Sequence, residues 1–255
     1  MNLKKIKKTH NHMFGLFKKK EQPAPLLFST DIHCHIVPGI DDGSPDASTS
    51  AELISRMMDW GIRRIIASPH VTMDTFENTP ATIAPALKSL KEELTARDID
   101  IDISHSAEYR IDEFFMNQMQ EGNIVPLPGN YLLMENSFIQ EPWGLDKLLF
   151  DLKVKGYRPI LAHPERYHYY HGRRQRYIDL HSTGTLFQIN LLSLAGYYGS
   201  SERSMASWLV ENGLVDFIGT DLHNHRHADH IERYLASKDY RRLASSGLRV
   251  LNDTL

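Results

Sequence analysis

Residues 31–42 read Asp-Ile-His-Cys-His-Ile-Val-Pro-Gly-Ile-Asp-Asp, and residues 219–223 read Gly-Thr-Asp-Leu-His. Each stretch follows an apolar run and carries two ligand-type side chains one residue apart. Side chains at positions i and i+2 of a strand point to the same face, so each pair can present both side chains to one point. Histidine and aspartate bind divalent transition metals. Because the pairs lie near opposite ends of the chain, they predict a fold that closes on itself around a metal site.

Between these two stretches, short apolar runs alternate with segments of helical periodicity. Strands are expected near 27–32, 63–68, 101–107, 131–135, 159–163, 185–190 and 215–219. Helices are expected over 47–60, 79–96, 144–155, 173–183 and 202–212, with a short helix near 111–120, a last helix over 228–246 and a closing segment at 247–252. Repeated strand–helix alternation indicates parallel strands joined by right-handed crossovers. We therefore expect an α/β fold, a closed barrel of seven strands whose active site lies at their C-terminal ends.

Composition is that of an ordinary soluble globular chain. The 255 residues are 41% apolar and 24% charged, and the formal net charge of −3 gives no general attraction for nucleic acid. The single cysteine, Cys34, excludes an internal disulfide and fits a reducing cytoplasm. Residues 26–255 are expected to form one domain. The basic segment 1–25 is expected to be a flexible tail, either simply solvated or docking weakly on anionic membrane.

Polar side chains follow every expected strand, and six of the seven strands end in a metal-ligand residue type. A lone histidine at such a place is more often a hydrogen-bonded structural residue, and an aspartate before Gly43 can build a turn or cap a helix. Separate capping needs would not put ligand types at nearly every strand end, so a multinuclear metal centre is predicted. Its candidate ligands are His33, His35, Asp42, His70, Glu108, Glu135, His163, Asp221 and His223.

This donor set exceeds the needs of one zinc ion and suffices for two or three divalent ions. Clustered cations lower the pKa of a bridging water and neutralise phosphate oxygens, so hydrolysis of a phosphate ester suits the set best. Amide and lactone hydrolysis remain open on the metal count alone. Arg166, three residues after His163, and Arg226, three after His223, favour phosphate because guanidinium groups bind its oxygens bidentately. The alternative is that both arginines are surface charges.

Five motifs, in this order and spacing, resemble the polymerase-and-histidinol-phosphatase (PHP) superfamily. They are the DIHCHIVPGIDDG opening, SPH at 68–70, AE at 107–108, AHPERY at 162–167 and TDLHN at 220–224. Within the superfamily they are most similar to the bacterial capsular-polysaccharide tyrosine phosphatases. The resemblance runs from about residue 28 to 252 and excludes the basic tail. It implies a distorted seven-stranded (β/α)7 barrel that holds three metal ions, commonly Mn²⁺ and sometimes iron or zinc.

The resemblance also implies a distribution of ligands. The first ion would take His33, His35, Glu108 and Asp221; Glu108 would bridge to a second ion held by Glu135 and His163; a third would take Asp42, His70 and His223. Asp42, rather than Asp41, matches the ligand position by its distance from the first motif. Arg166 matches the arginine that family members use on the phosphate. Arg226 is a looser match, because the His-rich stretch HNHRHADH departs from the family pattern.

The activity implied is hydrolysis of phosphotyrosine on protein, by attack of a metal-bound hydroxide. The implied partner is the tyrosine-rich tail of a membrane-associated bacterial tyrosine kinase that controls capsular or exopolysaccharide synthesis, which places the protein in the cytoplasm, at the inner face of the membrane. The chain lacks the Cys-x5-Arg loop of cysteine-based phosphatases, since Ile40 stands where the arginine would follow Cys34. A small-molecule phosphomonoesterase resembling histidinol phosphatase is the alternative. A non-catalytic binding protein and a nuclease are disfavoured by the intact ligand set and the lack of a basic patch.

Overall fold

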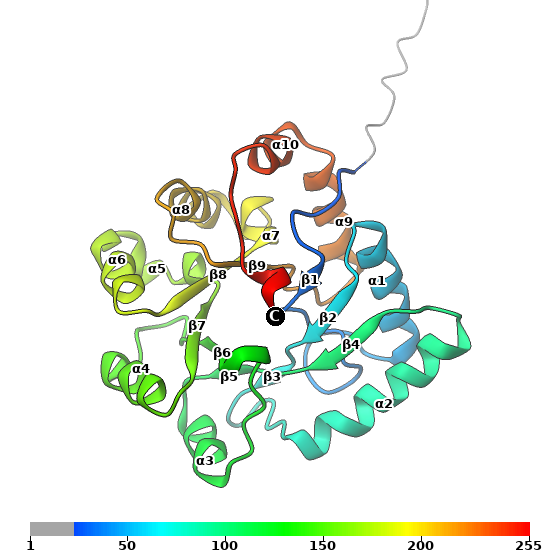
Figure 1. Ribbon diagram of the computed structural model, residues 1–255, viewed down its shortest axis with the longest axis horizontal. Coiled ribbons are helices and arrows are strands. Elements are labelled where there is room, and N and C mark those ends of the chain that lie inside the picture. Colours follow the sequence, from blue (N-terminus) through cyan, green and yellow to red (C-terminus); the bar gives the residue numbers. More distant parts are fainter. Residues whose placement is uncertain (1–22) are drawn as a thin grey trace, which may run out of the picture.

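The computed structural model describes residues 23–255, in which nine parallel strands form two sheets. The strands are β1 (Thr30–Asp31), β2 (Arg64–Ala67), β3 (His70–Val71), β4 (Asp102–His105), β5 (Glu108–Arg110), β6 (Tyr131–Glu135), β7 (Arg158–Ala162), β8 (Leu186–Asn190) and β9 (Phe217–Gly219). One sheet has the order β1-β2-β4 and the other β3-β5-β6-β7-β8-β9. Figure 1 shows the strands curled around a common centre, with the helices outside them. The fold is therefore mixed α/β with a curled parallel sheet.

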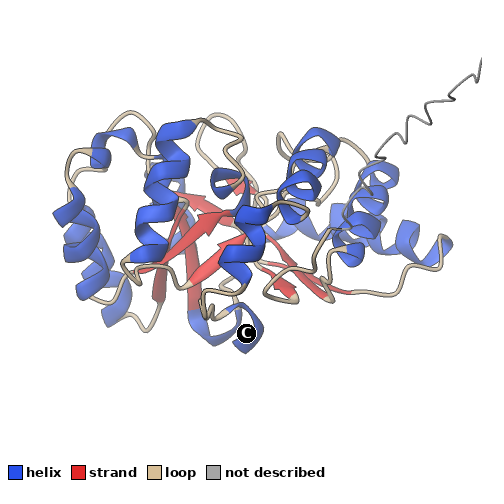
Figure 2. Cartoon of the chain, turned by 90° about the horizontal axis from the view of Figure 1, so that it is seen from above, coloured by secondary structure: helices blue, strands red, loops and turns tan. Residues whose placement is uncertain are grey.

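The division into two sheets differs from the expected seven strands. The strands expected at 63–68 and 101–107 correspond to β2 and β4, but each is followed by a break and a short further strand, β3 or β5. Pro69 stands in the first break and has no N–H to donate to a ladder. Backbone bonds from Ser106 N to Ala67 O (2.8 Å) and from Glu108 N to Pro69 O (3.0 Å) keep the two segments adjacent across the breaks. Figure 2 shows the strands in two groups, as this division requires.

The first and last strands are joined beyond their own C-terminal ends. Cys34 and Leu222 form a parallel bridge, with His35 N donating to Leu222 O at 2.9 Å. Asp221 N donates in turn to His33 O at 2.8 Å. The two stretches that carry the paired ligand types, His33-x-His35 and Asp221-x-His223, therefore lie side by side. The side chain of Cys34 is buried in the core, as expected from its place between the two histidines.

The chain's last residues tie β1 to β9 on the other side of the sheet. The closing segment expected at 247–252 leads into a 3₁₀ turn, η3 (Asn252–Thr254). The Asn252 side-chain amide donates to Thr30 O (3.0 Å) and Ile218 O (2.8 Å). Figure 1 shows this turn over the centre of the strands.

Helices cover the outside of the sheets. They are α1 (Ala47–Asp59), α2 (Pro80–Ala96), α3 (Glu113–Glu121), α4 (Leu145–Val154), α5 (His168–His171), α6 (Arg174–Ser182), α7 (Leu191–Leu194), α8 (Ser200–Glu211), α9 (His225–Leu235) and α10 (Lys238–Ala244), with 3₁₀ turns η1 (Pro128–Asn130) and η2 (Pro164–Arg166). The expected helices are confirmed to within about two residues, except the last. The segment expected as one helix over 228–246 forms two helices, because Ser237 is not helical and caps α10 by accepting from Tyr240 N (3.1 Å). The four-residue helices α5 and α7 were not expected.

The apolar core has two parts that separate the faces of the strands. A large cluster packs the helices against the sheets, and a smaller one includes Ile32, which directly follows β1, and Ile66, Leu133, Ile160 and Phe217 from four different strands. Along a strand, alternate residues share a face, so Leu133 and Glu135 of β6 point the same way. The smaller cluster therefore fills the space beneath the polar strand ends and leaves the C-terminal ends as the place for a site.

The start of the described chain also differs from the expected tail. Residues 1–22 of the tail expected over 1–25 lie outside the described residues. Ala24 N donates to Leu235 O (3.2 Å), and Pro25 O accepts from the Tyr240 hydroxyl (2.7 Å). The last residues of the expected tail are thus part of the fold. Within the described residues, no helix has both the length and the apolar character to span a membrane.

Candidate metal centre

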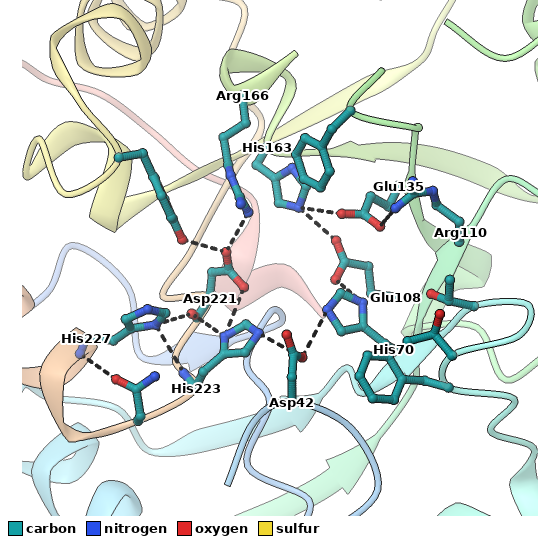
Figure 3. Close-up of a pocket in the computed structure, with 16 residues that line it drawn as sticks. Asp42, His70, Glu108, Arg110, Glu135, His163, Arg166, Asp221, His223 and His227 are labelled. Atoms are coloured by element: carbon teal, nitrogen blue, oxygen red, sulfur yellow. Dashed lines mark hydrogen bonds and ion pairs between the residues drawn. The ribbon is translucent and has the colours of Figure 1, made fainter. Parts of the chain in front are cut away.

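A pocket of about 500 Å³ lies at the C-terminal ends of the strands and gathers the predicted ligands (Figure 3). Seven of them line its wall, namely Asp42, His70, Glu108, Glu135, His163, Asp221 and His223. His33 and His35, which are fully buried, lie beneath the pocket and contact Glu108 and Asp221. The structure therefore brings all nine residues together from strand ends spread along the whole described chain.

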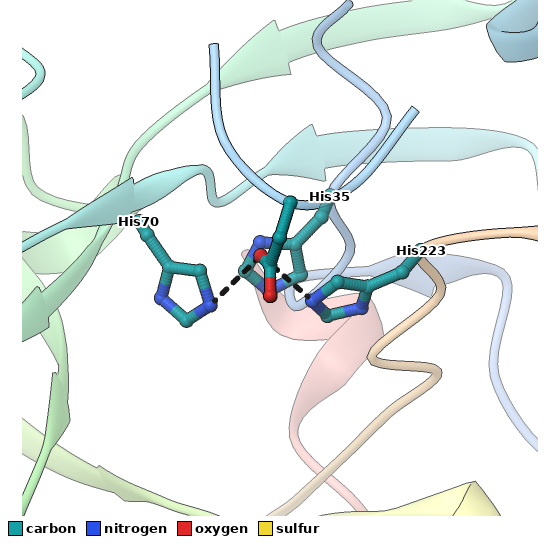
Figure 4. Close-up of side chains that lie close together, drawn as sticks. His35, His70 and His223 are labelled. Atoms are coloured by element: carbon teal, nitrogen blue, oxygen red, sulfur yellow. Dashed lines mark ion pairs between the residues drawn. The ribbon is translucent and has the colours of Figure 1, made fainter. Parts of the chain in front are cut away.

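The nine side chains form four overlapping groups whose ligand atoms lie within 4.8 Å of one another. The groups are His35–Asp42–His70–His223, His33–His35–Glu108, His33–His163–Asp221 and Glu108–Glu135–His163. Figure 4 shows His35, His70 and His223 close together. Asp42 Oδ1 lies 3.5 Å from Nε2 of both His70 and His223. The four groups do not by themselves define the three ion positions that the resemblance implies, because His33, His35, Glu108 and His163 each belong to two groups.

Several buried ligand atoms face one another without hydrogen bonds. His33 Nε2, His35 Nε2 and Glu108 Oε2 have no hydrogen-bond partner, although Glu108 Oε2 lies 3.2 Å from the first and 3.4 Å from the second. Leaving one buried polar atom unpaired costs about 1–3 kcal/mol. The positions and chemistry of these atoms fit divalent cations, which would satisfy several of them at once.

Hydrogen bonds on the far side of the imidazoles orient them. Nδ1 of His33 lies 2.7 Å from Gln188 Oε1, and Nδ1 of His35 lies 2.9 Å from Asp41 Oδ2. Both partners are acceptors, so each Nδ1 carries a proton, and each Nε2 faces Glu108 and Asp221, whose charges raise the pKa of His33 to about 9 against the opposing effect of burial. Asp41 also accepts from the backbone N of Gly43 and His70, at 2.9 and 3.0 Å. Asp41 thus supports His35, while Asp42 is the acid that faces the pocket.

The charges of the site are set by burial and by near neighbours. Burial lowers the pKa of His70 to about 4, and burial together with Arg166 lowers the pKa of His163 to about 4. Both rings are therefore neutral at physiological pH, the form that binds a metal. Burial and the charge of Glu108 raise the pKa of Glu135 to about 8. The neighbouring carboxylates of Glu108 and Glu135 favour sharing one proton or one cation.

The backbone at two ligand positions takes an uncommon conformation. His163 has φ 32° and Asp221 has φ 50°, in the left-handed region that L residues rarely adopt. Both stand where a strand has just ended, and the turn directs their side chains into the pocket. Nearby, a Cβ on Gly219 would lie 2.6 Å from His33 Cβ and 2.8 Å from Gln188 Nε2. Only glycine leaves room there for the His33–Gln188 pair.

The two predicted phosphate arginines have different places. Arg166 lines the pocket, with Nη1 3.3 Å from Asp221 Oδ2. Its guanidinium carbon lies 4.7 Å from the ring centroid of Phe138 and 4.2 Å from that of Tyr198. Arg226 does not line the pocket: it is exposed in the first turn of α9, with its guanidinium 5.5 Å from the Tyr197 ring centroid. The expected role of Arg226 is therefore not supported by its position.

Arg226 points away from the pocket because of the position at which α9 begins. Asn224 is the N-cap of the helix and accepts from His227 N at 3.0 Å. The helix that follows turns His227 toward the pocket and Arg226 away from it. The His-rich stretch has no periodicity from which this rotation could be read.

The pocket wall also contains residues that were not predicted from the sequence, among them Arg110, Phe138, Tyr198 and His227. Arg110 Nη1 donates to Glu135 Oε2 at 2.8 Å. Arg110 is two residues after Glu108, so the alternation of a strand could have placed both on one face had the strand been expected to reach that far. Phe138 and Tyr198 lie in loops, where the sequence gives no periodic signal.

The protein family described as "Capsular polysaccharide synthesis, CpsB/CapC" matches residues 29–241 of this chain. The chain belongs to this family. The resemblance expected from the motifs is thereby confirmed. Among its relatives, this CpsB/CapC member is 34% identical over 195 residues to a Bacillus subtilis (strain 168) protein named tyrosine-protein phosphatase YwqE, covering 76% of this chain and 77% of the relative. It is 29% identical over 206 residues to Streptococcus pneumoniae tyrosine-protein phosphatase CpsB, covering 76% and 82%.

Solved structures agree with this placement. A structure described as one of YwqE from Bacillus subtilis and CpsB from Streptococcus pneumoniae, "unique metal-dependent tyrosine phosphatases", superposes with a TM-score of 0.74 at 32% identity. The match covers 84% of this chain and 90% of the other. An amidohydrolase from Mycoplasma synoviae matches with a TM-score of 0.55 at 11% identity, which shows a likeness of fold alone.

Proposed function

We propose that this CpsB/CapC member is a metal-dependent phosphatase that hydrolyses phosphotyrosine on protein. The observation that carries the proposal is the set of buried, unpaired ligand atoms of His33, His35 and Glu108 directly beneath a pocket that also holds Arg166. Its relatives are named tyrosine-protein phosphatases, and the superposed structure is described as metal-dependent. The nine residues predicted as ligands are proposed to hold the metal, in the distribution that the motifs imply.

The donor set supports two or three divalent ions. Mixed imidazole and carboxylate donors suit Mn²⁺, and they also accept iron or zinc, so Mn²⁺ is the first candidate and the other two are alternatives. When bound, such ions supply positive charge against phosphate oxygens and make nearby water more acidic. The chain contributes the geometry: the outer hydrogen bonds of Asp41 and Gln188 hold the imidazoles of His35 and His33 in place.

Arg166 is proposed to bind the phosphate. Phe138 and Tyr198 lie against its guanidinium, which restricts the side chain before substrate arrives. Arg110 also lies near the Phe138 ring, 5.8 Å from its centroid, and is a second cation at this wall. Positive groups fixed in a partly buried pocket stabilise the charge that spreads over the phosphate oxygens during transfer.

The Phe138 ring suits the aromatic group of the substrate. It stacks on His163 with ring centroids 5.7 Å apart and planes 15° apart, and it remains partly exposed at the edge of the pocket. A phosphotyrosine ring can pack against the exposed part of Phe138 while its phosphate reaches Arg166. Such a wall offers little to an aliphatic phosphate ester, which favours an aryl substrate.

The physiological partner is proposed to be the tyrosine-rich tail of a membrane-associated bacterial tyrosine kinase that controls capsule or exopolysaccharide synthesis. The description of the family supports the link to capsular polysaccharide synthesis. The protein would then act in the cytoplasm, at the inner face of the membrane. Residues 1–22, which lie outside the described residues, carry the basic run proposed to dock on anionic lipid. Equal binding to anionic vesicles by the full chain and by a chain lacking these residues would refute that docking.

The test of the substrate class compares phosphotyrosyl peptides with histidinol phosphate on the same metal-loaded protein. We expect a much higher kcat/KM for the peptides. A preference for histidinol phosphate would instead establish a small-molecule phosphomonoesterase. Replacing Phe138 by leucine should lower kcat/KM for phosphotyrosine more than for an aliphatic phosphate ester, because only the aromatic substrate uses the ring.

A further inference from the structure

Large apolar side chains are exposed beside the pocket, on the loop of residues 136–144 between β6 and α4. The Trp143 side chain is fully exposed, and Ile139 is 87% exposed. Exposed tryptophan is uncommon on a surface that only meets water, and tryptophan is enriched where proteins bind one another. The loop therefore displays a binding group that the folded chain itself does not use.

The same loop is firmly held by its polar groups. Asn136 N donates to the Tyr167 hydroxyl (2.9 Å), and Ser137 O accepts from the Tyr169 hydroxyl (2.9 Å). Further along, Glu141 receives two bonds from Arg176, at 2.8 and 3.0 Å. These bonds fix the loop while leaving Ile139 and Trp143 in solvent. A surface that is already ordered loses little conformational entropy when a partner binds.

Trp143 forms one wall of a cavity of about 690 Å³ between α3 and α4, which we call the apolar groove. Its apolar lining is Ile111, Met116, Pro142, Trp143 and Leu148. Figure 1 shows α3 and α4 as neighbours on the outside of the fold. The groove is wide enough for a large apolar side chain, and Met116 and Trp143 at its edge are both exposed.

Both walls of the apolar groove continue from the catalytic pocket. Arg110 lines the pocket, and the next residue, Ile111, lines the groove, held by a bond from its N–H to Glu135 O (2.9 Å). On the other wall, Phe138 lines the pocket and Pro142 lines the groove, within one short loop. A peptide whose phosphotyrosine occupies the pocket can therefore run directly along the groove.

Three of the four charged side chains that line the groove, those of Asp112, Lys147 and Asp151, are already engaged within the fold, and Glu113 is the fourth. Asp112 accepts from Phe115 N and Met73 N, both at 2.9 Å, and Lys147 pairs with Asp151 at 2.5 Å. The occupant is therefore selected by apolar contact more than by charge. We propose that the apolar groove binds a bulky apolar or aromatic side chain of the substrate peptide, a few residues from its phosphotyrosine. This inference rests on the proposed function, since it names the substrate that the pocket shares.

The test uses the full-length, metal-loaded protein and phosphotyrosyl peptides of alanine in which one leucine or phenylalanine is moved along each flank. We expect one flank position to lower KM about tenfold, the size of effect that a buried tryptophan contact supports. Trp143→Ala should abolish that preference. Phe150→Ala is the matched control, because Phe150 is an exposed aromatic residue on α4 that does not line the groove. Turnover of free phosphotyrosine should be equal in all three proteins.

Other results would refute the proposed binding role of the apolar groove. They are the absence of any flank preference, a preference kept in Trp143→Ala, or an equal loss in Phe150→Ala. A change from dimer to monomer in sedimentation on replacing Trp143 would show that a second copy occupies it, and loss of binding to anionic vesicles would show that lipid does.

A failure of the proposed function remains distinguishable from a failure of the groove. If the wild type hydrolyses no phosphotyrosyl substrate, the function is refuted. The groove is then tested by the binding of fluorescent peptides carrying a non-hydrolysable phosphonate. Weaker binding of the apolar-flanked peptide to Trp143→Ala than to Phe150→Ala would support it, and equal binding would contradict it.

Discussion

Arg166 and Tyr198 are arranged as a unit: the guanidinium carbon lies 4.2 Å from the Tyr198 ring centroid, and both side chains bond to the same Asp221 Oδ2. Asn190 Nδ2 also donates to that oxygen, at 2.5 Å. One oxygen of Asp221 is therefore held by three donors, which leaves the other, Oδ1, directed at His33 and His35. This arrangement links the proposed phosphate arginine to a proposed metal ligand.

Two replacements of Tyr198 distinguish the contribution of its ring from that of its hydroxyl. Tyr198→Phe keeps the ring over Arg166 and removes one bond to Asp221, so we expect a loss of a few-fold in kcat/KM, equivalent to about 1 kcal/mol. Tyr198→Leu also removes the stacking and should lose clearly more. Steady-state kinetics on a phosphotyrosyl peptide check both. Equal losses in the two variants would show that the ring does not position Arg166.

Arg166→Lys should strongly reduce kcat/KM. A lysine keeps the charge but has no planar fork to bind two phosphate oxygens or to lie between two rings. We expect kcat/KM to fall about 100-fold, which corresponds to about 2.7 kcal/mol, with metal content unchanged. Kinetics paired with metal analysis provide the check. Near-normal turnover by the lysine variant would remove Arg166 from the phosphate site.

Asp41→Asn should weaken metal binding although Asp41 does not face the pocket. Its carboxylate fixes the proton of His35 on Nδ1, and loss of such a partner lowers metal affinity about 10- to 100-fold. Competition with a chelator of known affinity measures the change. Asp46→Asn is a suitable control, because that acid caps α1 away from the site. Unchanged affinity in Asp41→Asn would mean that His35 needs no support.

Gly219→Ala should disturb the site through packing alone. The new Cβ would meet His33 Cβ and Gln188 Nε2 well inside contact distance, so His33 or its partner must move. We expect a loss of about 1–3 kcal/mol in the free energy of unfolding together with weaker metal binding. Urea unfolding and metal titration check this, with Gly213→Ala for comparison, since a Cβ there would meet nothing within 4 Å. Gly213 has φ 66°, so that control can show some backbone strain but no effect on the metal.

A histidine far from the pocket predicts a pH dependence of stability. His181 Nε2 lies 3.0 Å from Asp216 Oδ2, and this bond raises the pKa of His181 above its ordinary value of 6.5, against the opposing effect of burial. The contribution of the pair is full below pH 6.5 and is lost as the pH rises through the folded-state pKa. His181→Gln should therefore destabilise the protein by about 1 kcal/mol at pH 6 and by less at pH 9. Urea unfolding at both pH values tests it; a difference that grows with pH would contradict the assignment.

The sequence allowed the site to be predicted better than the sheet. Ligand types at strand ends, His33 and His35 above all, are spaced by the alternation of a strand, and the structure places these side chains together. The breaks at Pro69 and Ser106 divide the sheet, although β3 and β5 keep the pairing and register of β2 and β4, and only β5 gains a new partner, β6. Such a new pairing depends on contacts between distant segments, which local pattern does not contain.

Most errors in the predicted site share one cause. Arg226 points away from the pocket because Asn224 fixes where α9 begins, and Phe138 and Tyr198 enter the pocket from loops. The direction of a loop side chain, or the rotation of a helix with no apolar period, follows from tertiary packing. Arg110 is the exception, since the alternation after Glu108 could have placed it.

The central claim, that buried histidines and carboxylates hold the metal on which catalysis depends, is tested most directly by removing and restoring that metal. Chelated protein should lose turnover of a phosphotyrosyl peptide, and added Mn²⁺ should restore it with two or three ions bound per chain. His33→Ala, treated in the same way, should stay inactive and bind fewer ions. Undiminished turnover by chelated, metal-free protein would contradict the account.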